Sequence, residues 1–327
     1  MSLFVVGDGL GWSIDDDRAR LVATARRLGY SVGSNALLRF LRRQAVFQHN
    51  HFNALQPRWL ESSHRLGLSY FHGRPGTAGY PEFDRAYDAL RQDAARIDRV
   101  QVTHDEMKEL VVGAGVPSER VFKIPIGIDL EHFPLGPERD GSEFVVGSFV
   151  KDGVGMDDGL EPKLLKGPDT FVAVVAHLRG VVPRLSVLLT GPARGYVRRE
   201  LERLGVSHRH VLARSREELG RAYADADVCV VTSRQEGGPK AALEAMASGV
   251  PLVSTRVGQV AELVRDGENG LLADVDDVEG LVGAVVRVRE DAALRERLRR
   301  AGRATAEQNA EERLDPLWAK LLEGFAR

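Results

Sequence analysis

In the second half of the chain, short apolar runs alternate with longer segments in which apolar residues recur at helical spacing. The short runs are typical of buried strands, and the longer segments are bounded by Pro and Gly, as helices are. This alternation predicts a parallel, doubly wound sheet that is covered on both faces. The expected strands are Phe144–Val150, Leu185–Thr190, Asp227–Thr232, Leu252–Ser254 and Gly270–Ala273, and the expected helices are Pro168–Arg179, Ala193–Leu204, one from Pro239 and one near Gln259–Arg265.

The first half of the chain shows the same pattern less regularly. Its expected strands are Leu3–Gly7, Ala45–Gln48, Leu68–Phe71, Arg99–Val102 and Val121–Ile124. Gly127–Ser142, rich in Gly, Pro and charge, is typical of a linker. We therefore expect two Rossmann-like domains, residues 1–136 and 137–311. Residues 306–327 have the apolar stripe of an amphipathic helix, and we expect residues 312–327 to pack back on the first domain.

The composition is that of a globular protein with balanced charge. The formal net charge of −2 leaves no excess of Lys and Arg, which argues against nucleic acid as a partner. The single cysteine, Cys229, excludes an internal disulfide and a multi-cysteine metal site. No secretory signal or apolar run of roughly 20 residues is visible, so we expect a cytoplasmic protein.

A segment with two glutamates, Glu236 and Glu244, follows the apolar run Val228–Val231. It continues with Gly237–Gly238, and Pro239 suits the first position of a helix. A helix that begins after glycines presents free backbone N–H groups and the positive end of its dipole, which bind phosphate. Glu244 has apolar neighbours, among which a carboxylate needs donors such as sugar hydroxyls. The segment therefore favours a ligand with hydroxyls on both sides of a diphosphate, such as a nucleotide sugar.

Two simpler interpretations of this segment stay open. Lys240 and Glu244 are spaced for an ion pair on a helix surface. Gly237–Gly238 also fits an ordinary tight turn. Short motifs of this kind also occur by chance.

The Glu-x7-Glu segment and the two α/β domains together resemble a GT-B-fold glycosyltransferase, most similar to the retaining group called glycosyltransferase family 4. The resemblance is strongest over Glu143–Ala273. Further segments that resemble family landmarks, in the same order, are Ile124–Phe133, Lys166–Asp169, Ala222–Val228 and Arg265–Leu272. The resemblance implies two domains facing across a cleft, with the donor bound mainly by the second and the acceptor by the first.

The resemblance also implies roles for single residues. Glu236 lies beside the donor sugar, and Glu244 holds the ribose hydroxyls. Lys166 neutralises the departing diphosphate; a solvated surface lysine is the alternative. The donor-binding residues that begin the helix are Gly237, Gly238, Pro239, Lys240 and Ala241, of which Pro239 has no N–H to donate.

One family feature is missing from this sequence. The family usually places an arginine after the glycine of the strand that begins the second domain, but here Gly147 is followed by Ser148. The second cation for the diphosphate is therefore unassigned. Lys151 is the nearest candidate, with Lys163 behind it.

Histidines in the first half are further candidates. His72 follows an expected strand and resembles a family position near the donor sugar; a structural histidine is the alternative. His49 and His51 resemble an acceptor-side region, and metal ligation is a weaker alternative.

The glycine-rich start and the aspartate groups need no cofactor or metal. Gly9 and Gly11 do not complete a dinucleotide fingerprint, and we expect them near the donor phosphates or the acceptor. Asp15–Asp17 and Asp276–Asp277 stand where helix N-caps are expected. We expect no metal site.

The stretch Ala36–Gln44 is basic and amphipathic. An ordinary solvated helix face is the favoured interpretation. A weak peripheral contact with the inner membrane face is the alternative, since related enzymes that act on lipid-linked acceptors use such helices.

Together the residues and the resemblance imply a retaining glycosyltransferase that uses a nucleoside-diphosphate-sugar and a hydroxyl acceptor, which is a glycan, a lipid-linked sugar or a small molecule. Front-face attack, in which the diphosphate oxygen takes the acceptor proton, accounts for the absence of a paired acid and nucleophile. Two alternatives stay open. A GT-B-fold nucleotide-sugar epimerase needs additional acid–base residues, and the missing arginine favours a non-catalytic nucleotide-sugar-binding homologue.

Overall fold

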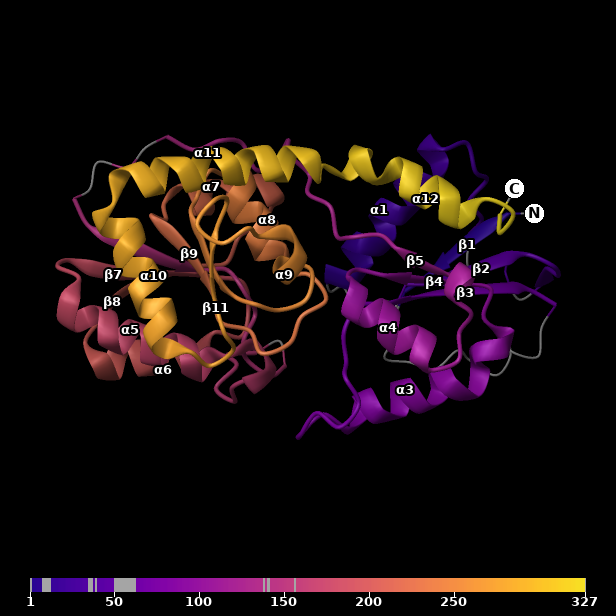
Figure 1. The fold of residues 1–327 in the computed structure, drawn as a ribbon, viewed down its shortest axis with the longest axis horizontal. Coiled ribbons are helices and arrows are strands. Elements are labelled where there is room, and N and C mark those ends of the chain that lie inside the picture. The colour runs from indigo at the N-terminus through magenta and orange to yellow at the C-terminus, as the bar shows by residue number, and fades with distance from the viewer. Residues whose placement is uncertain are drawn as a thin grey trace. The chain divides into compact units, whose positions relative to one another are not determined.

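The computed structural model describes residues 2–7, 13–34, 38, 40–49, 63–137, 139, 142–155 and 157–326, with the side chains of 13–16 left aside. The chain forms two compact units (Figure 1). The first unit consists of Met1–Pro125 and Glu312–Arg327, and the second of Ile126–Glu311. Both are α/β, as the sequence predicts. No helix in the described part of the chain is long and apolar enough to cross a membrane.

The first unit contains a five-stranded parallel sheet in the order β1-β2-β3-β4-β5. Helices α3 and α4 contribute to the core on one face of this sheet, and α1 and α12 to the core on the other. The strands are β1 (Leu3–Val6), β2 (Ala45–Gln48), β3 (Arg65–Tyr70), β4 (Arg99–Val102) and β5 (Val121–Lys123), and the helices are α1 (Ser13–Arg27), α3 (Pro81–Asp93) and α4 (Asp105–Gly113).

The second unit contains a six-stranded parallel sheet in the order β11-β10-β9-β6-β7-β8. Chain order reverses beside β6, because β7 pairs with one of its edges and β9 with the other. The carboxyl ends of the strands at such a switch point are the usual ligand site of an open parallel sheet. The strands are β6 (Phe144–Ser148), β7 (Leu185–Thr190), β8 (Ser207–Val211), β9 (Val228–Val231), β10 (Leu252–Thr255) and β11 (Leu271–Ala273).

Helices cover both faces of this second sheet. Helices α5, α6 and α10 supply the core on one face, and α7 and α8 supply the core on the other (Figure 1). The helices are α5 (Pro168–Val181), α6 (Gly195–Leu204), α7 (Arg216–Ala224), α8 (Lys240–Ala247), α9 (Val260–Leu263), α10 (Val278–Glu290) and α11 (Ala292–Gln308), and a short 3-10 turn, η4 (Leu164–Lys166), precedes α5.

Strand β8 is an element that the sequence pattern did not predict. It has the sequence Ser-His-Arg-His-Val and is only partly buried, so it carries no apolar run. It pairs only with β7, at the edge of the sheet. Polar and charged residues are common on edge strands, where they discourage pairing with other chains.

The expected boundary between the domains, after residue 136, is too late in the sequence. The structure divides the chain between Pro125 and Ile126. The expected linker packs on the second unit, since Ile128 and Phe133 are buried in the same cluster as Tyr223. Its backbone is held there as well, because the N–H of Gly136 donates to the carbonyl of Ser248 at 3.0 Å. The composition of this segment is typical of a linker, and its contacts with residues distant in the sequence leave no local pattern.

The C-terminal segment belongs to the first unit but is not one continuous helix. Helix α11 ends at Gln308, and α12 (Asp315–Leu322) begins after a 3-10 turn, with Pro316 in its first turn. Proline lacks the N–H that a helix interior needs but is tolerated in the first turn, so it marks the start of a new helix. Phe325 then lies edge-on to Phe47, with ring centroids 6.3 Å apart.

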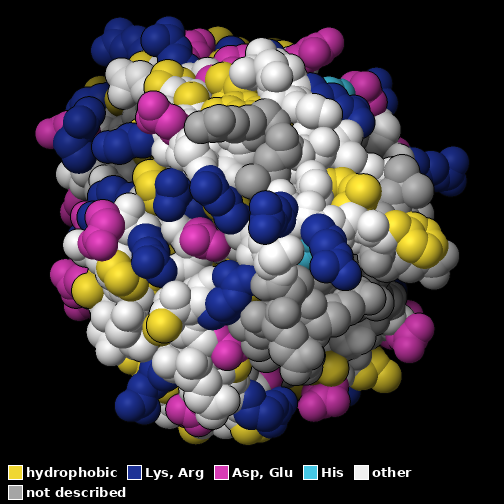
Figure 2. All heavy atoms as spheres, turned by 90° about the vertical axis from the view of Figure 1, so that its right-hand side faces the viewer, with side chains coloured by type: hydrophobic (Ala, Val, Ile, Leu, Met, Phe, Trp, Pro, Cys, Tyr) yellow, Lys and Arg dark blue, Asp and Glu magenta, His cyan; other side chains and the backbone are white. Residues whose placement is uncertain are grey.

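The expected amphipathic stretch Ala36–Gln44 lies partly outside the described residues. Leu38 is buried, whereas Phe40 is 71% exposed and Leu41 is 39% exposed. Figure 2 shows Lys and Arg side chains gathered in a band across a face of the first unit. Arginines also meet at the amino ends of its strands: burial lowers the pKa of Arg99, the charge of Asp98 raises it, and the charges of Arg65 and Arg120 lower it. Positive charge is therefore concentrated locally in a chain whose net charge is −2.

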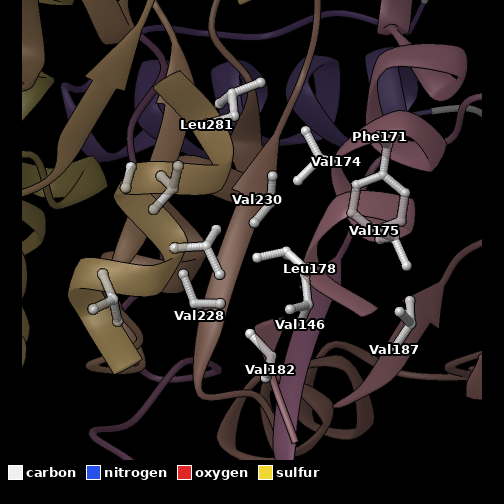
Figure 3. Close-up of a cluster of buried hydrophobic side chains, with 14 of the residues drawn as sticks. Val146, Phe171, Val174, Val175, Leu178, Val182, Val187, Val228, Val230 and Leu281 are labelled. Atoms are coloured by element: carbon white, nitrogen blue, oxygen red, sulfur yellow. The ribbon is translucent and has the colours of Figure 1, made fainter. Parts of the chain in front are cut away.

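The core of the second unit is built mainly from valines of the sheet and apolar residues of α5. Leu178 lies among Val146, Val182 and Val228 and is fully buried (Figure 3). Valine is stiff and β-branched, which suits the crowded pleated surface of a strand. The packing of α5 fixes the position of its first turn, which adjoins the site described below.

We expect Leu178→Ala to lower the free energy of unfolding by about 2–5 kcal/mol, because the substitution leaves a cavity in this core. Urea denaturation of the full chain measures the effect. Leu212→Ala is the matched control, since Leu212 is 61% exposed and should change stability by less than about 0.5 kcal/mol. Equal losses in the two variants would contradict the assigned core.

Candidate active site

The loop between β9 and α8 lies at the switch point of the second sheet. Pro239 is the N-cap of α8, with extended backbone angles (φ −63°, ψ 111°), and the helix begins at Lys240. The sequence predicts Pro239 as the first helical residue, so the helix begins one residue later than predicted. Because proline offers no side-chain acceptor, it does not cap the first N–H groups of the helix, and these groups suit an anionic ligand.

Gly238 allows close packing beside this helix start. A Cβ atom at Gly238 would lie 2.7 Å from Oε1 of Gln259 and 3.0 Å from Cδ1 of Ile126. Gln259 in turn holds the backbone of Ile126: its Oε1 accepts the N–H at 2.7 Å, and its Nε2 donates to the carbonyl at 3.0 Å. Because Gly238 has no side chain, the start of α8 can pack closely against Gln259 and against Ile126, the first residue of the second unit.

Lys166 reaches the same loop from η4. Gly167 follows in the left-handed region (φ +62°), and a Cβ there would overlap the carbonyl oxygen of Thr232. Thr232 Oγ1 donates to the carbonyl of Gly167 at 2.8 Å, which ties the turn to the end of β9. A glycine is needed directly after Lys166, because only glycine suits both the left-handed backbone angle and the close approach to Thr232.

Lys166 and Glu236 form an ion pair. Nζ of Lys166 lies 2.6 Å from Oε1 of Glu236, and Ser233 Oγ donates to the same oxygen at 2.9 Å. Glu236 is 7% exposed and the Lys166 side chain 19%. A buried carboxylate is stable only with such partners, so each charged group compensates the other.

Arg234 fixes the first turn of α5 against the loop. Its guanidinium donates to both carboxylate oxygens of Asp169 at 2.8 Å, and Nε donates to Asp276 at 3.0 Å. The bond to Asp169 raises the pKa of Arg234, so its charge is permanent. As expected, Asp277 caps a helix: its side chain accepts a hydrogen bond from the N–H of Gly280 at 2.8 Å. Asp276 was also expected to be an N-cap, but it accepts a hydrogen bond from Arg234.

Glu244 is held inside α8 by a tyrosine. Its Oε2 accepts a hydrogen bond from the hydroxyl of Tyr223, on α7, at 2.8 Å. Glu244 is 8% exposed and Tyr223 is fully buried, so Glu244 does not occupy the helix-surface position that a simple ion pair with Lys240 would need. Burial and the Glu244 charge raise the pKa of Tyr223, which keeps the hydroxyl a donor. The Phe149 ring stacks on Tyr223 at 3.7 Å.

Part of the chain matches the family model described as "Glycosyl transferases group 1", over residues 160–291. The match contains Lys166, Glu236 and Glu244. Residues 160–291 form a group 1 glycosyltransferase domain. The resemblance found in the sequence is therefore confirmed.

Two curated relatives and one solved structure show the extent of the similarity. A D-inositol 3-phosphate glycosyltransferase of Corynebacterium jeikeium is 31% identical over 234 residues, or 67% of this chain and 55% of the relative. The lipopolysaccharide core biosynthesis glycosyltransferase LpsE of Rhizobium meliloti is 37% identical over 140 residues, 43% of this chain and 41% of the relative. The chain thus spans about half the length of the curated relatives it matches.

The solved structure is that of Anabaena Alr3699/HepE. It has a TM-score of 0.77 at 17% identity and covers 98% of this chain and 99% of its own. At this identity the likeness shows the fold alone, and it confirms the expected GT-B fold with two Rossmann-like units.

The sequence lacks the expected arginine after Gly147, and the guanidinium of Arg194 lies against the residue at that position, Ser148. Arg194, fully buried, donates through Nη2 to Ser148 Oγ at 2.8 Å and through Nε to Asp152 Oδ1 at 2.9 Å. These bonds hold the segment that carries Lys151. Burial, and then the charge of Lys166, lower the pKa of Lys151, so the two lysines lie near each other.

The other predicted site residues belong to the first unit. His72 follows β3 and lies edge-on to Phe83, with ring centroids 5.7 Å apart. His49 follows β2, is 3% exposed and has Nδ1 3.0 Å from Ser69 Oγ, as a structural histidine would. His51, Gly9 and Gly11 lie outside the described residues. Among the residues that are described, no group of three or more His, Cys, Asp or Glu could hold a metal ion.

We expect Asp152→Ala to lower the free energy of unfolding by about 3–5 kcal/mol, because it leaves the Arg194 charge buried without its partner. Denaturation in urea measures the loss. The control is Glu200→Ala, which removes a partner of the exposed Arg203 and should cost less than about 1 kcal/mol. The double variant Asp152→Ala/Arg194→Met should recover part of the stability, and a further loss in it would contradict this explanation.

Proposed function

We propose that the protein transfers a sugar from a nucleoside diphosphate donor to a hydroxyl group of an acceptor. The observation that carries this proposal is the Lys166–Glu236 ion pair beside the uncapped start of α8, with Glu244 buried in the same helix. A cation, the backbone N–H groups of a helix start and two carboxylates match a diphosphate with sugar hydroxyls on both sides. The similar Anabaena protein was solved with UDP and with UDP-glucose, which supports this ligand class.

In this proposal the donor exchanges the partners of the ion pair. A phosphate oxygen replaces Glu236 on Lys166, and Glu236 then accepts hydrogen bonds from the donor sugar. Glu244, oriented by Tyr223, accepts from the ribose hydroxyls. Backbone N–H groups at the helix start contact the phosphates and the sugar; they belong to Gly237, Gly238, Lys240 and Ala241.

Stabilisation of the leaving diphosphate is the main catalytic contribution that we propose. Negative charge develops on its oxygen as the glycosidic bond breaks, and fixed positive charges stabilise that charge. Lys166, Lys151 and the helix start supply them, so we expect transfer to persist in the presence of a chelator. Attack from the front face retains the anomeric configuration, and the diphosphate oxygen takes the proton of the acceptor hydroxyl.

The first unit supplies the acceptor side in this proposal. We assign His72 to the donor sugar and His51 to the acceptor. His49, which is buried against Ser69, is assigned to holding this acceptor-side region in place. Gly9 and Gly11 are assigned to a loop near the donor phosphates or the acceptor.

A thermal-shift panel of UDP-, GDP-, ADP- and dTDP-sugars should identify the donor, because a ligand at 100 times its dissociation constant adds about 2.7 kcal/mol of stability. One nucleotide should stand out from the others. No shift with any of them would count against donor binding.

Incubation of the donor without acceptor separates transfer from epimerisation, since an epimerase would produce an epimer. A protein that binds the donor but neither hydrolyses nor transfers it would be a non-catalytic homologue.

Substitutions of the two glutamates should have different effects. Glu244→Ala should weaken donor binding about tenfold or more, because hydrogen bonds to a charged group contribute about 1.5–3 kcal/mol. Tyr223→Phe should act in the same direction by a smaller factor. Glu236→Ala should mainly lower kcat, since its sugar contact tightens in the transition state.

Donor titration and steady-state kinetics measure these effects, with the exposed Glu202 of α6 as the matched control, substituted by Ala. The control should behave like the unsubstituted protein. Unchanged binding and turnover in both Glu244→Ala and Glu236→Ala would remove the proposed site.

A further inference from the structure

A cavity of about 670 Å³ lies at the opposite end of the second sheet from the proposed donor site. It is bordered by the residues just before β9 and β10, by the first residue of β6 and by the junction between α10 and α11. Because the strands are parallel, their amino ends all meet here. Its size falls within the range of about 300–1,000 Å³ that is typical of small-molecule sites.

Several arginines and carboxylates line this cavity. The arginines come from the segment before β6, the turn before β7, and α10 and α11. The lining arginines are Arg139, Arg184, Arg289, Arg295 and Arg299, and the lining carboxylates are Glu143, Asp227, Glu290 and Glu296.

Two of the arginines have carboxylate partners. Arg139 donates to Asp227 at 3.1 Å, and Asp227 also accepts the N–H of Val145 at 2.7 Å, so this carboxylate is engaged in holding β6. Arg289 lies 3.7 Å from Glu290. Arg139 also lies 3.9 Å from Glu143. With Glu296 counted as well, the five arginines and four carboxylates of the described lining carry a net charge of +1, and three of the arginines stand outside these pairs.

Those three have no carboxylate within ion-pair distance in the described part of the chain. Arg295 donates to the carbonyls of Val288 and Arg289 at 3.0 and 3.2 Å, and Arg299 donates to the carbonyl of Pro137 at 3.4 Å. Carbonyl partners orient a guanidinium without neutralising it, and each guanidinium carries five N–H donors.

Arg184 provides an independent indication. It is exposed and adopts φ +51°, a left-handed conformation that is uncommon for any residue other than glycine. Strained backbone of this kind clusters at ligand sites, where the surrounding structure maintains it. Here the turn places an arginine, rather than a glycine, at the rim of the cavity.

We propose that this cavity binds a small molecule that carries two or more phosphate groups. Arginine forks match phosphate oxygens in a bidentate manner, and guanidinium groups arriving from the β7 turn and from α11 fit a ligand with more than one such group. The proposed donor site lies at the carboxyl ends of the strands, so the two sites are separate.

The test is calorimetric titration of the full chain with inorganic pyrophosphate at constant ionic strength, in a Lys166→Ala variant that weakens the proposed donor site. This variant should still bind pyrophosphate. Adding Arg184→Asn should weaken binding at least tenfold, and asparagine tolerates the left-handed backbone, so folding should be preserved. Arg179→Asn, at an exposed arginine outside the cavity, is the matched control and should change nothing.

A second variant tests the cavity by gain of affinity. Glu296 is exposed and lines the cavity, so Glu296→Gln should tighten pyrophosphate binding by removing a like charge. No binding in the Lys166→Ala variant, or equal binding with Arg184→Asn and Arg179→Asn, would overturn the proposal. Failure of the donor proposal would instead appear as identical titrations of the unsubstituted protein and Lys166→Ala.

Discussion

The ion pair between Lys166 and Glu236 is the interaction on which the proposed site depends. It connects the turn before α5 to the loop after β9, two segments that are distant in sequence. Gly167 brings their backbones together, and Arg234 fastens the same junction through Asp169. A buried carboxylate would be unstable without these partners. The pair therefore keeps both charges in place and, in our account, is opened by a donor phosphate.

Much of this arrangement could be predicted from the sequence. The continuous apolar runs predicted β6, β7 and β9, because strands buried on both faces need continuous apolar residues. Gly-Gly-Pro before an Ala-rich segment predicted the start of α8 to within one residue. The ion pair between Lys166 and Glu236 was not predicted: the family resemblance assigned each residue to the donor separately, and no local pattern relates the two.

The parts that could not be predicted depend on tertiary contacts. Arg194 has the sequence context of a surface arginine, yet its guanidinium is buried against Asp152 and Ser148. The bond from Tyr223 to Glu244 links two helices and leaves no periodic signal. Edge strand β8 lacks an apolar run because one of its edges is unpaired. The interruption between α11 and α12 did have a signal in the sequence, Pro316. We predicted one continuous helix because the apolar stripe runs across this position.

In the proposed function, Lys166 contacts the outer phosphate of a nucleoside diphosphate. The most direct measurement is the affinity of the unsubstituted chain and of Lys166→Gln for the diphosphate and the monophosphate of the nucleoside that binds best. The account predicts that the substitution weakens the diphosphate at least tenfold, while the monophosphate, which lacks the outer phosphate, changes by less than about twofold. Equal diphosphate affinity in the two proteins would contradict it.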